Sequence, residues 1–464
     1  MVEGMTATAA PPHVSVRLPR ATPRWWADLG GVFAGTSLLI VTALWVANGG
    51  VQLLGTDFWT ATGRLTGLWA SDLLLVQVLL MARIPLVERA FGQDRLARWH
   101  RWVGFTSFWL LVAHIVLITI GYSSLSRFIP ELWDLTWTYP GMLLAVAGTA
   151  LLIMVVVTSI RAARRRLRYE SWHLLHLYAY LGAGLALPHQ LWTGGDFVSS
   201  PAATVYWWTL YAASAGAVLT YRIGLPLWRT WRHRLVVSHV EPSGPGLTSV
   251  YLAGRRLDRL PVRAGQFFQW RFLDGPGWSR AHPYSLSATP HGHQLRITVK
   301  DLGDGSARVA GIRPGTRVLI EGPYGKLTGE TYAGGPVTLL ACGIGVTPLL
   351  SLLGELPYRP GEATLVYRAR SREEIAFHEE LEWFAANRGV RVAYLLGPRA
   401  PRRSWLPGQF ADHADAYALR QIVPSVAQSQ VYVCGPDEWT AAAREAALGA
   451  GVPEARVHTE LFSW

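Results

Sequence analysis

Four histidines lie in two apolar stretches of the sequence, and their type and spacing suit a metal site. His176 and His189 are 13 residues apart within 172–190, which contains no Asp, Glu, Lys or Arg, and His100 and His114 are 14 residues apart on another apolar segment. An imidazole in hydrocarbon costs free energy unless a partner satisfies it, so intramembrane histidines are functional candidates. On α-helices these spacings correspond to rises of ~19.5 Å and ~21 Å. If the helices lie side by side, His100 faces His176 and His114 faces His189, and each pair can supply both axial ligands of a haem iron.

Other interpretations of these histidines remain open. Each ring could serve helix packing through a local hydrogen bond, but four rings at matched depths favour metal ligation. His173 lies one turn before His176, at the expected membrane interface where a polar ring is solvated, and is an alternative inner ligand. On a regular helix His189 is ~140° from the face of His176. Because Pro188 removes a helical hydrogen bond, we predict an irregular helix over 184–189, and a regular helix there would weaken the outer pair.

The composition indicates where these helices lie. Half of the 464 residues are hydrophobic and only 16% are charged, which is a low charged fraction for a soluble protein. The apolar excess falls in six charge-poor runs, each near the ~20 residues that a helix needs to cross a bilayer. The runs cover residues 29–48, 65–82, 102–122, 138–160, 171–191 and 203–221.

Arginine is unevenly distributed among the segments that connect these runs. It is concentrated in every second segment, namely 1–28, 83–101, 161–170 and 222–234, whereas the alternating segments contain only Arg64 and Arg127. The positive-inside rule therefore predicts a multi-pass protein of the cell membrane with both termini cytoplasmic. Flanking arginines account for much of the net charge of +12, so we predict no nucleic-acid partner. Asp72, inside the second run, is either a proton carrier or, as we favour, a residue paired with a neighbour.

The second half of the chain has the composition of a soluble protein. After Arg234, short β-branched and aromatic segments between Gly/Pro turns predict a small antiparallel β-barrel over about 235–328. From Pro336 onward, strand patterns alternate with helix patterns. That alternation predicts a parallel sheet with crossover helices.

Two motifs of the barrel region suit a flavin nucleotide. In the first, a ring followed by a small hydroxyl residue can lie against a flavin while a cation meets the pyrophosphate; its residues are Arg280, His282, Pro283, Tyr284, Ser285 and Ser287. The second is a turn-rich run whose backbone N–H groups could cradle phosphate; its residues are Lys300, Gly303, Gly305 and Ser306. Either could be an ordinary turn, but together, before a dinucleotide-type domain, they favour FAD.

Two further motifs suit a second dinucleotide. One follows a strand and opens a helix, with Gly343, Gly345, Thr347 and Pro348. Its glycines permit a tight turn, and the helix N-terminus attracts a pyrophosphate, although the full GxGxxG pattern is absent and the motif is weak by itself. The other closes a later strand with Cys434, Gly435 and Pro436, at the sheet edge where open α/β sheets bind ligands.

These motifs in this order, behind six apolar runs with paired histidines, resemble the ferric reductase and NADPH oxidase superfamily. Its members join a haem-binding six-helix membrane domain to a ferredoxin–NADP reductase-like module, and the resemblance covers the chain from about residue 30 onward. The chain is therefore predicted to be multidomain. The expected domains are a disordered cytoplasmic tail (1–28), a six-helix transmembrane haem domain (29–228), an FAD-binding β-barrel (229–330) and an NAD(P)H-binding α/β domain (331–464).

The resemblance also implies roles for individual residues. The four histidines would ligate two haem irons, and the two pairs of motifs would bind FAD and the nicotinamide nucleotide. The sulfur of Cys434 would lie near the nicotinamide as a polar wall, and Glu460 would lie near the flavin edge. Phe462, with Trp464 as runner-up, would cover the flavin ring until the nucleotide displaces it. Soluble reductases of this type usually carry Arg at the position of His282.

The choice between NADPH and NADH depends on the end of the second strand of the nucleotide domain. Arg368 and Arg370 follow that strand, and no acidic residue there awaits a free ribose hydroxyl. Cations suit a 2′-phosphate, whereas the alternative is a solvated charged loop, since Glu373 and Glu374 follow. We favour NADPH, with NADH possible.

The expected function is transmembrane electron transfer from cytosolic NADPH, through FAD and two b-type haems, to an extracytoplasmic acceptor, which is dioxygen or a ferric chelate. Arg64 and Arg127 are the outer cations, and the Trp-rich segment 132–139 is a candidate cover for the outer haem. One alternative is a haem-free membrane anchor with a flavin reductase that serves a quinone or a cytoplasmic partner. Another is a transporter with a regulatory nucleotide domain.

Overall fold

The computed structural model describes two compact units of the chain, which divide between Pro226 and Leu227. The described residues are 25–123, 125–164, 166–167, 169–275, 277–278, 280–400 and 402–461. The predicted tail up to residue 24, and the predicted flavin-covering residues Phe462 and Trp464, lie outside them. Each unit is described by itself below.

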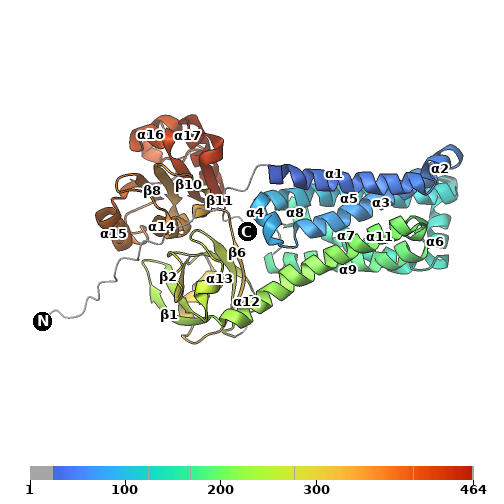
Figure 1. Ribbon diagram of the computed structural model, residues 1–464, viewed down its shortest axis with the longest axis horizontal. Helices are drawn as coiled ribbons and strands as arrows, with labels where there is room; N and C mark the ends of the chain where they lie inside the picture. Colours follow the sequence, from blue (N-terminus) through green and yellow to red (C-terminus); the bar gives the residue numbers. More distant parts are fainter. Residues whose placement is uncertain are drawn as a thin grey trace. The chain divides into compact units, whose positions relative to one another are not determined.

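The N-terminal unit is a bundle of long helices that lie side by side, with short helices at both ends (Figure 1). Each of the six predicted apolar runs lies largely within one long helix. The long helices are α1 (Trp25–Ala47), α3 (Phe58–Leu80), α5 (Gln93–Tyr122), α7 (Met142–Ser159), α9 (Tyr169–Trp192) and α11 (Pro201–Ala217). The short ones are α2 (Gly50–Thr56), α4 (Pro85–Phe91), α6 (Phe128–Thr138), α8 (Arg161–Arg164) and α10 (Gly195–Val198).

Three helices in the described part of the chain are long and apolar enough to cross a membrane, and they lie within α3, α5 and α7. A fourth span is possible if Gly35–Ala47 and Gly50–Thr56, bent by 62°, count as one. Helix α11 has only 17 residues, and α9 carries histidines, tyrosines and a proline that lower its hydropathy. The membrane character is therefore supported, whereas six spans remain a prediction.

Glycines bring the helices of the bundle close together in two tightly packed pairs, α3 with α5 and α7 with α9. A Cβ atom on Gly67 of α3 would lie 2.5 Å from Nδ1 of His114 on α5, and one on Gly148 of α7 would lie 2.6 Å from the carbonyl oxygen of Gly182 on α9. Small residues at such contacts are how membrane helices gain packing in the absence of a hydrophobic driving force between them.

Asp72 is fully buried and connects three helices. Its Oδ1 accepts hydrogen bonds of 2.6 Å from Ser37 Oγ on α1 and from Tyr206 Oη on α11. The predicted pairing with neighbours is thus confirmed. Arg64, predicted as an outer cation, forms a two-point ion pair with Asp196 of α10, at 2.6 and 2.7 Å.

After helix α12 (Leu225–His233), short antiparallel strands form a two-sheet lobe in the first part of the C-terminal unit. Its sheets have the strand orders β1-β2-β5 and β4-β3-β6, and all their pairings are antiparallel, as predicted. Single bridges between Val236 and Arg317 and between Leu286 and Ile297 also occur. The strands are β1 (Val236–Pro242), β2 (Leu247–Ala253), β3 (Phe267–Phe272), β4 (His282–Ser285), β5 (Gln294–Lys300) and β6 (Val318–Tyr324). A closed barrel remains a prediction.

The rest of this unit is a parallel-sheet lobe, also as predicted. Its sheet has the order β11-β10-β7-β8-β9, with every pair parallel. The strands are β7 (Val337–Cys342), β8 (Ala363–Ala369), β9 (Arg391–Leu396), β10 (Gln430–Gly435) and β11 (Val457–Leu461), and the main helices are α14 (Val346–Glu355), α15 (His378–Arg388), α16 (Asp415–Ile422) and α17 (Asp437–Gly449). The strand order reverses between β7 and β10, and open α/β sheets bind ligands at the carboxyl ends of such strands.

Candidate functional site

The structure brings together both predicted pairs of histidines between α5 and α9. In the first pair, the ring centres of His100 and His176 are 5.8 Å apart. In the second pair, those of His114 and His189 are 6.4 Å apart. Helices α5 and α9 have little backbone contact with each other, so side chains make their closest approach.

Each of these four rings has its Nδ1 atom within hydrogen-bond distance of a neighbouring group. Such a partner orients an imidazole and leaves Nε2 for a metal, as is usual for metal-ligating histidines. The partners are Gln77 O for His100 at 3.3 Å, Gly63 O for His114 at 2.8 Å, Ser159 Oγ for His176 at 3.2 Å and Thr193 Oγ1 for His189 at 2.7 Å. Within the described residues, Nε2 of all four rings lacks a hydrogen bond and can bind a metal.

The distances between the rings fit one metal atom in each pair. Metal–imidazole bonds are about 2 Å long, and the ring centre lies about 1 Å beyond the nitrogen, so two imidazoles on opposite sides of a metal have centres ~6 Å apart. The described residues contain no group of three or more His, Cys, Asp or Glu that could hold a metal. Two ligands in each pair therefore fit a metal that brings its remaining ligands with it, as haem iron does.

The predicted irregularity over 184–189 is wrong, because α9 is one unbroken helix with Pro188 inside it. His189 nevertheless reaches His114, since its ring is held through Nδ1 by Thr193 on the next turn. The orientation of the side chain, rather than a break in the helix, thus closes the second pair. His173 takes part in neither pair; its ring centre lies 6.5 Å from that of Trp172.

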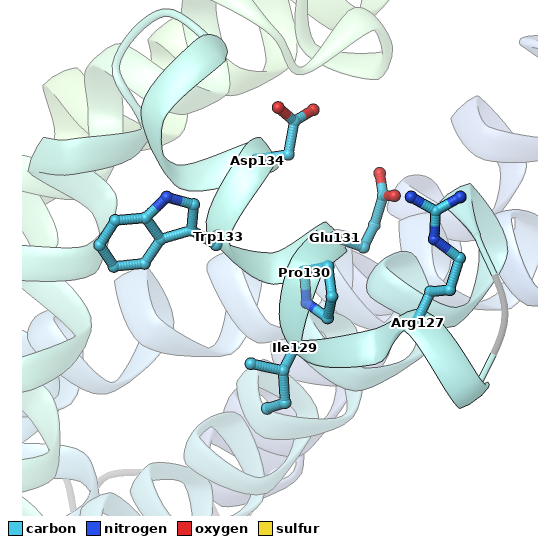
Figure 2. A pocket seen from close by; sticks show the side chains of 6 residues that line it. All are labelled: Arg127, Ile129, Pro130, Glu131, Trp133 and Asp134. Carbon is cyan, nitrogen blue, oxygen red and sulfur yellow. The ribbon is translucent and has the colours of Figure 1, made fainter.

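A pocket of about 540 Å³ lies beside α6, at the end of the bundle toward which α5 runs from His100 to His114 (Figures 1 and 2). Figure 2 shows the charged ends of Arg127 and Glu131 on one side of the segment. The pocket is lined by Arg127, Ile129, Pro130, Glu131, Trp133 and Asp134. The second histidine pair is the nearer of the two pairs to this end.

The first flavin motif forms β4 and offers a flat surface and a free hydroxyl. The rings of His282 and Tyr284 are stacked, 5.8 Å apart at an angle of 7°, and burial raises the pKa of Tyr284 to about 12, so its phenol stays neutral. Ser285 Oγ is buried and has no hydrogen-bond partner in the described part of the chain. Since a buried unpaired hydroxyl is costly, this atom fits a bound group that would satisfy it. The hydroxyl of Ser287, by contrast, is engaged by Thr298 and Arg296.

The second flavin motif lies against the first. A Cβ on Gly305 would lie 3.1 Å from the ring of His282, and both residues line a small cleft with Arg280. Two backbone N–H groups of this turn have side-chain partners within the turn itself, because Gly303 N donates to Asp301 Oδ1 and Leu302 N donates to Ser306 Oγ. Lys300 is at the end of β5, which leads into this turn.

The two nucleotide motifs meet where β7 and β10 end. A Cβ on Gly345 would lie 2.3 Å from the carbonyl oxygen of Cys434, and one on Gly435 would lie 2.8 Å from Cβ of Cys342. Only glycine permits this contact between the turn after β7 and the end of β10. Thr347 and Pro348 are buried in the first turns of α14, and Pro436 caps α17. The structure thus assembles the predicted motifs at the reversal point of the sheet.

Cys434 and Glu460 are register neighbours on β10 and β11. Burial, followed by the nearby Glu460 carboxylate, raises the pKa of the Cys434 thiol well above its ordinary value. The thiol is therefore neutral at physiological pH. Glu460 also accepts a 3.3 Å hydrogen bond from the backbone N–H of Lys326, next to Gly325.

The two arginines at the end of β8 have different surroundings. Arg368 is buried, and its guanidinium donates to the carbonyls of Ala369, Leu395, Gly397 and Pro398. Arg370 is exposed. Of these two arginines, Arg370 is thus the one placed to meet a phosphate.

Sequence reasoning missed several residues of the site. The partners of the four Nδ1 atoms were not predicted; only Thr193, four residues after His189, has a spacing that could have revealed it. The ion pair between Arg296 and Glu380 joins residues far apart in the sequence and leaves no local pattern.

Known proteins resemble the two units separately. Residues 66–187 match the family described as "Ferric reductase like transmembrane component", and residues 339–445 match "Oxidoreductase NAD-binding domain". The flavohemoprotein of Bordetella pertussis is 32% identical over 251 residues, which are 51% of this chain and 61% of that protein, so the chain spans about three fifths of the relative's length.

Other relatives match the C-terminal unit. Ferredoxin–NADP reductase B of Sorangium cellulosum is 30% identical over 196 residues, or 40% of this chain and 80% of that enzyme. The FAD/NAD-binding domain of nitric oxide dioxygenase from Vibrio cholerae has 25% identity and a TM-score of 0.40, over 49% of this chain and 98% of that one. The chain therefore joins a ferric reductase-like transmembrane component to an oxidoreductase module, the combination found in ferric reductases and NADPH oxidases, and through that module it belongs to the ferredoxin–NADP reductase family.

Proposed function

We propose that the chain transfers electrons across a membrane, from cytosolic NADPH through FAD and two b-type haems to an acceptor on the other side. The observation that carries the proposal is the presence of two histidine pairs on the same two helices, with ring centres 5.8 and 6.4 Å apart. A protein-only zinc site uses three or four side chains. A pair of imidazoles instead completes the coordination of an iron already held by a porphyrin.

The chain's own residues prepare the site at which NADPH would meet FAD. Bound FAD would supply the conversion of a two-electron donor into single electrons. The close contact between Gly345 and Cys434 brings the two nucleotide motifs together at the sheet edge, and Arg370 would supply a cation for a 2′-phosphate. The neutral thiol of Cys434 adds no charge beside a nicotinamide. The stacked His282 and Tyr284 and the unpaired Ser285 hydroxyl suit a flavin.

The proposal includes the predicted arrangement in the membrane. The six long helices would be six spans with both termini in the cytoplasm, and the haem, FAD and NAD(P)H domains would cover 29–228, 229–330 and 331–464. The coincidence of each apolar run with a long helix supports six spans. The bridges Val236–Arg317 and Leu286–Ile297 support closure of the two sheets into a barrel.

The acceptor would be dioxygen or a ferric chelate that reaches the second histidine pair. The pocket beside α6, of about 540 Å³, is open to the surroundings and lined by the single segment 127–134, and it is larger than dioxygen needs. Its charges are mixed, since Glu131 and Asp134 line it beside Arg127, so its size alone bears on the acceptor. We therefore favour ferric-chelate reduction, which superoxide dismutase would leave intact, over superoxide production.

Optical spectra of the purified full chain, before and after dithionite, test the proposal. We expect b-type haem bands from two haems per chain, loss of one haem when either member of a pair is changed to Ala, and retention of both in the control His173→Ala. NADPH without oxygen should reduce flavin and then haem. A protein with no dithionite-reducible haem band would overturn the relay and leave the alternative of a haem-free flavin reductase.

A further inference from the structure

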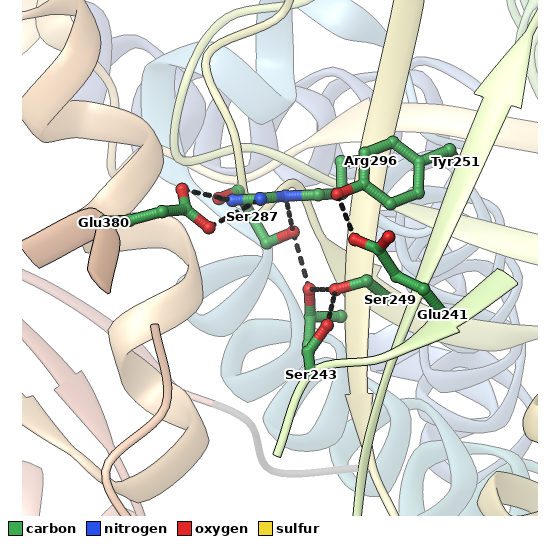
Figure 3. A network of polar contacts seen from close by, with 8 residues as sticks. Glu241, Ser243, Ser249, Tyr251, Ser287, Arg296 and Glu380 are labelled. Atoms are coloured by element: carbon green, nitrogen blue, oxygen red, sulfur yellow. Dashed lines mark hydrogen bonds and ion pairs between the residues drawn. The ribbon is translucent and has the colours of Figure 1, made fainter. Parts of the chain in front are cut away.

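A largely buried guanidinium connects the two lobes of the C-terminal unit. Arg296 lies on β5 of the two-sheet lobe, and Glu380 lies on α15 of the parallel-sheet lobe. Arg296 Nη1 and Nη2 donate to Glu380 Oε1 and Oε2 at 2.7 and 2.9 Å (Figure 3). The Arg296 side chain is 11% exposed and that of Glu380 is 41% exposed. Two parallel hydrogen bonds between planar groups are both stronger and more specific than a single surface ion pair.

The same guanidinium holds the end of the flavin motif. Arg296 Nε donates to Ser287 Oγ at 3.1 Å, and Nη2 donates to Ser287 O at 2.6 Å. Ser287 Oγ also accepts from Thr298, which contacts Ser249, so the position of Ser287 is fixed from two sides. Since Ser287 is two residues after Ser285, the guanidinium links the flavin motif to α15.

A second contact holds the next residues of this segment against the nucleotide motif. Thr289 Oγ1 donates to Ser351 O at 2.9 Å, and Ser351 Oγ donates back to Ala288 O at 2.8 Å. Ser351 is on α14, the helix opened by the glycine motif. Gly354 permits this approach, because a Cβ there would lie 2.1 Å from Thr289 Oγ1. We call residues 287–289 the clasp segment. Helix α14 holds it directly, and α15 holds it through Arg296.

The position of the clasp segment depends on the carboxylate of Glu380. The ring of Phe377, next to the start of α15, lies 5.1 Å from the Arg296 guanidinium. Without Glu380, two donors of a largely buried cation would lose their partner, which costs far more than an exposed ion pair is worth. Relief of that cost requires Arg296 to move, and Ser287 would move with it.

We propose that Arg296, held by Glu380, is a positioning residue that sets how closely the nucleotide approaches the flavin. The inference rests on the proposed transfer of hydride from NADPH to FAD. Neither side chain is assigned contact with a cofactor. They fix the spacing of the two motifs that would hold the cofactors, and a displacement of ~1 Å can slow such a reaction by up to about 100-fold.

The test compares Glu380→Gln and Glu380→Asp with Glu382→Gln, which changes a carboxylate that is 67% exposed on the same helix. Each full-length protein is loaded with FAD, its flavin content and Tm are recorded, and anaerobic flavin reduction is followed by stopped flow at saturating NADPH and at saturating 4-deuterated NADPH. We expect Glu380→Gln to bind FAD normally but to reduce it at least ~10-fold more slowly. We also expect an increased isotope effect, partial rescue in Glu380→Asp and no change in Glu382→Gln.

A merely structural role predicts a different pattern. If Glu380→Gln loses stability while its flavin-loaded fraction is reduced at the wild-type rate with the wild-type isotope effect, the inference is overturned. If Glu380→Gln fails to hold FAD, the same comparison is made with Glu380→Asp. A wild-type reduction rate and isotope effect in that variant would overturn the inference, and a slower rate with a larger isotope effect would support it. If NADPH does not reduce the flavin of the wild-type protein, the proposed function itself is refuted.

Discussion

Gly67 allows the most local test of the second histidine pair. A Cβ added at this position of α3 would lie 2.5 Å from Nδ1, 2.8 Å from Cε1 and 2.9 Å from Cγ of His114. Carbon atoms in contact are normally about 3.5–4 Å apart. In Gly67→Ala the ring must therefore retreat by ~1 Å, or α3 and α5 must separate by as much.

Either movement disturbs the ligand in two ways. The ring leaves the carbonyl of Gly63, now 2.8 Å from Nδ1, and its Nε2 moves relative to His189. Loss of such an outer hydrogen bond typically lowers metal affinity by about 10–100-fold, and the overpacking adds about 1–3 kcal/mol of strain. We expect Gly67→Ala to lose the haem of the second pair and to keep the haem of the first pair, ~20 Å away along the helices.

The assay is the haem-to-protein ratio of the purified chain, together with a redox titration of the reduced haem band. Wild-type protein should give two haems and two potentials, and Gly67→Ala should give one of each. Gly184→Ala on α9, where a Cβ would meet nothing within 4 Å, is the matched control and should keep both. A Gly67→Ala protein with two haems at wild-type potentials would refute the predicted geometry of this pair.

Three further predictions concern the C-terminal unit. Ser285→Ala removes a buried, unpaired hydroxyl and should weaken FAD binding about 5-fold, or ~1 kcal/mol, in titrations of the flavin-free protein; unchanged affinity would show that this hydroxyl does not meet the flavin. The pKa of Cys434 is raised in the folded protein, so little of its thiolate is present at pH 8–9. Alkylation of Cys434 in the native protein should therefore stay slow at this pH, and fast labelling of Cys434 would contradict the expectation. Arg370→Ala should raise the KM for NADPH about 10-fold but not that for NADH, whereas Arg368→Ala should mainly lower the Tm; equal effects on the two nucleotides would argue against Arg370.

The sequence was most informative where chemistry repeats at a regular spacing. The pairing of His100 with His176 and of His114 with His189 follows from helical rise alone, because two helices that run the same way align residues 13 and 14 apart. The parallel sheet follows from its alternating strands and helices. The error at 184–189 arose because an ideal helical wheel fixes Cβ directions but not χ angles, and Thr193 determines where the ring of His189 points.

Contacts between distant segments could not be predicted from one sequence. Arg296 and Glu380 are 84 residues apart, and neither stands in a motif. Arg368 and Arg370 look equivalent in the sequence, yet Arg368 lies inside β8 and is buried, whereas Arg370 follows the last residue of that strand and is exposed. Burial, which decides what a charged side chain does, is a property of the tertiary packing.

The partners of the four histidines differ in a way that bears on how firmly each ring is fixed. His100 and His114, both on α5, face backbone carbonyls of α3. A carbonyl can only accept, so Nδ1 of each must carry the proton and Nε2 must keep its lone pair for a metal. On α9, the Thr193 hydroxyl donates its one hydrogen to the carbonyl of His189, so it accepts from Nδ1 of that ring and fixes the same tautomer. His176 faces the hydroxyl of Ser159, which can donate or accept. Three of the four rings are therefore held in the metal-binding tautomer before any metal arrives, whereas His176 can adopt it afterward.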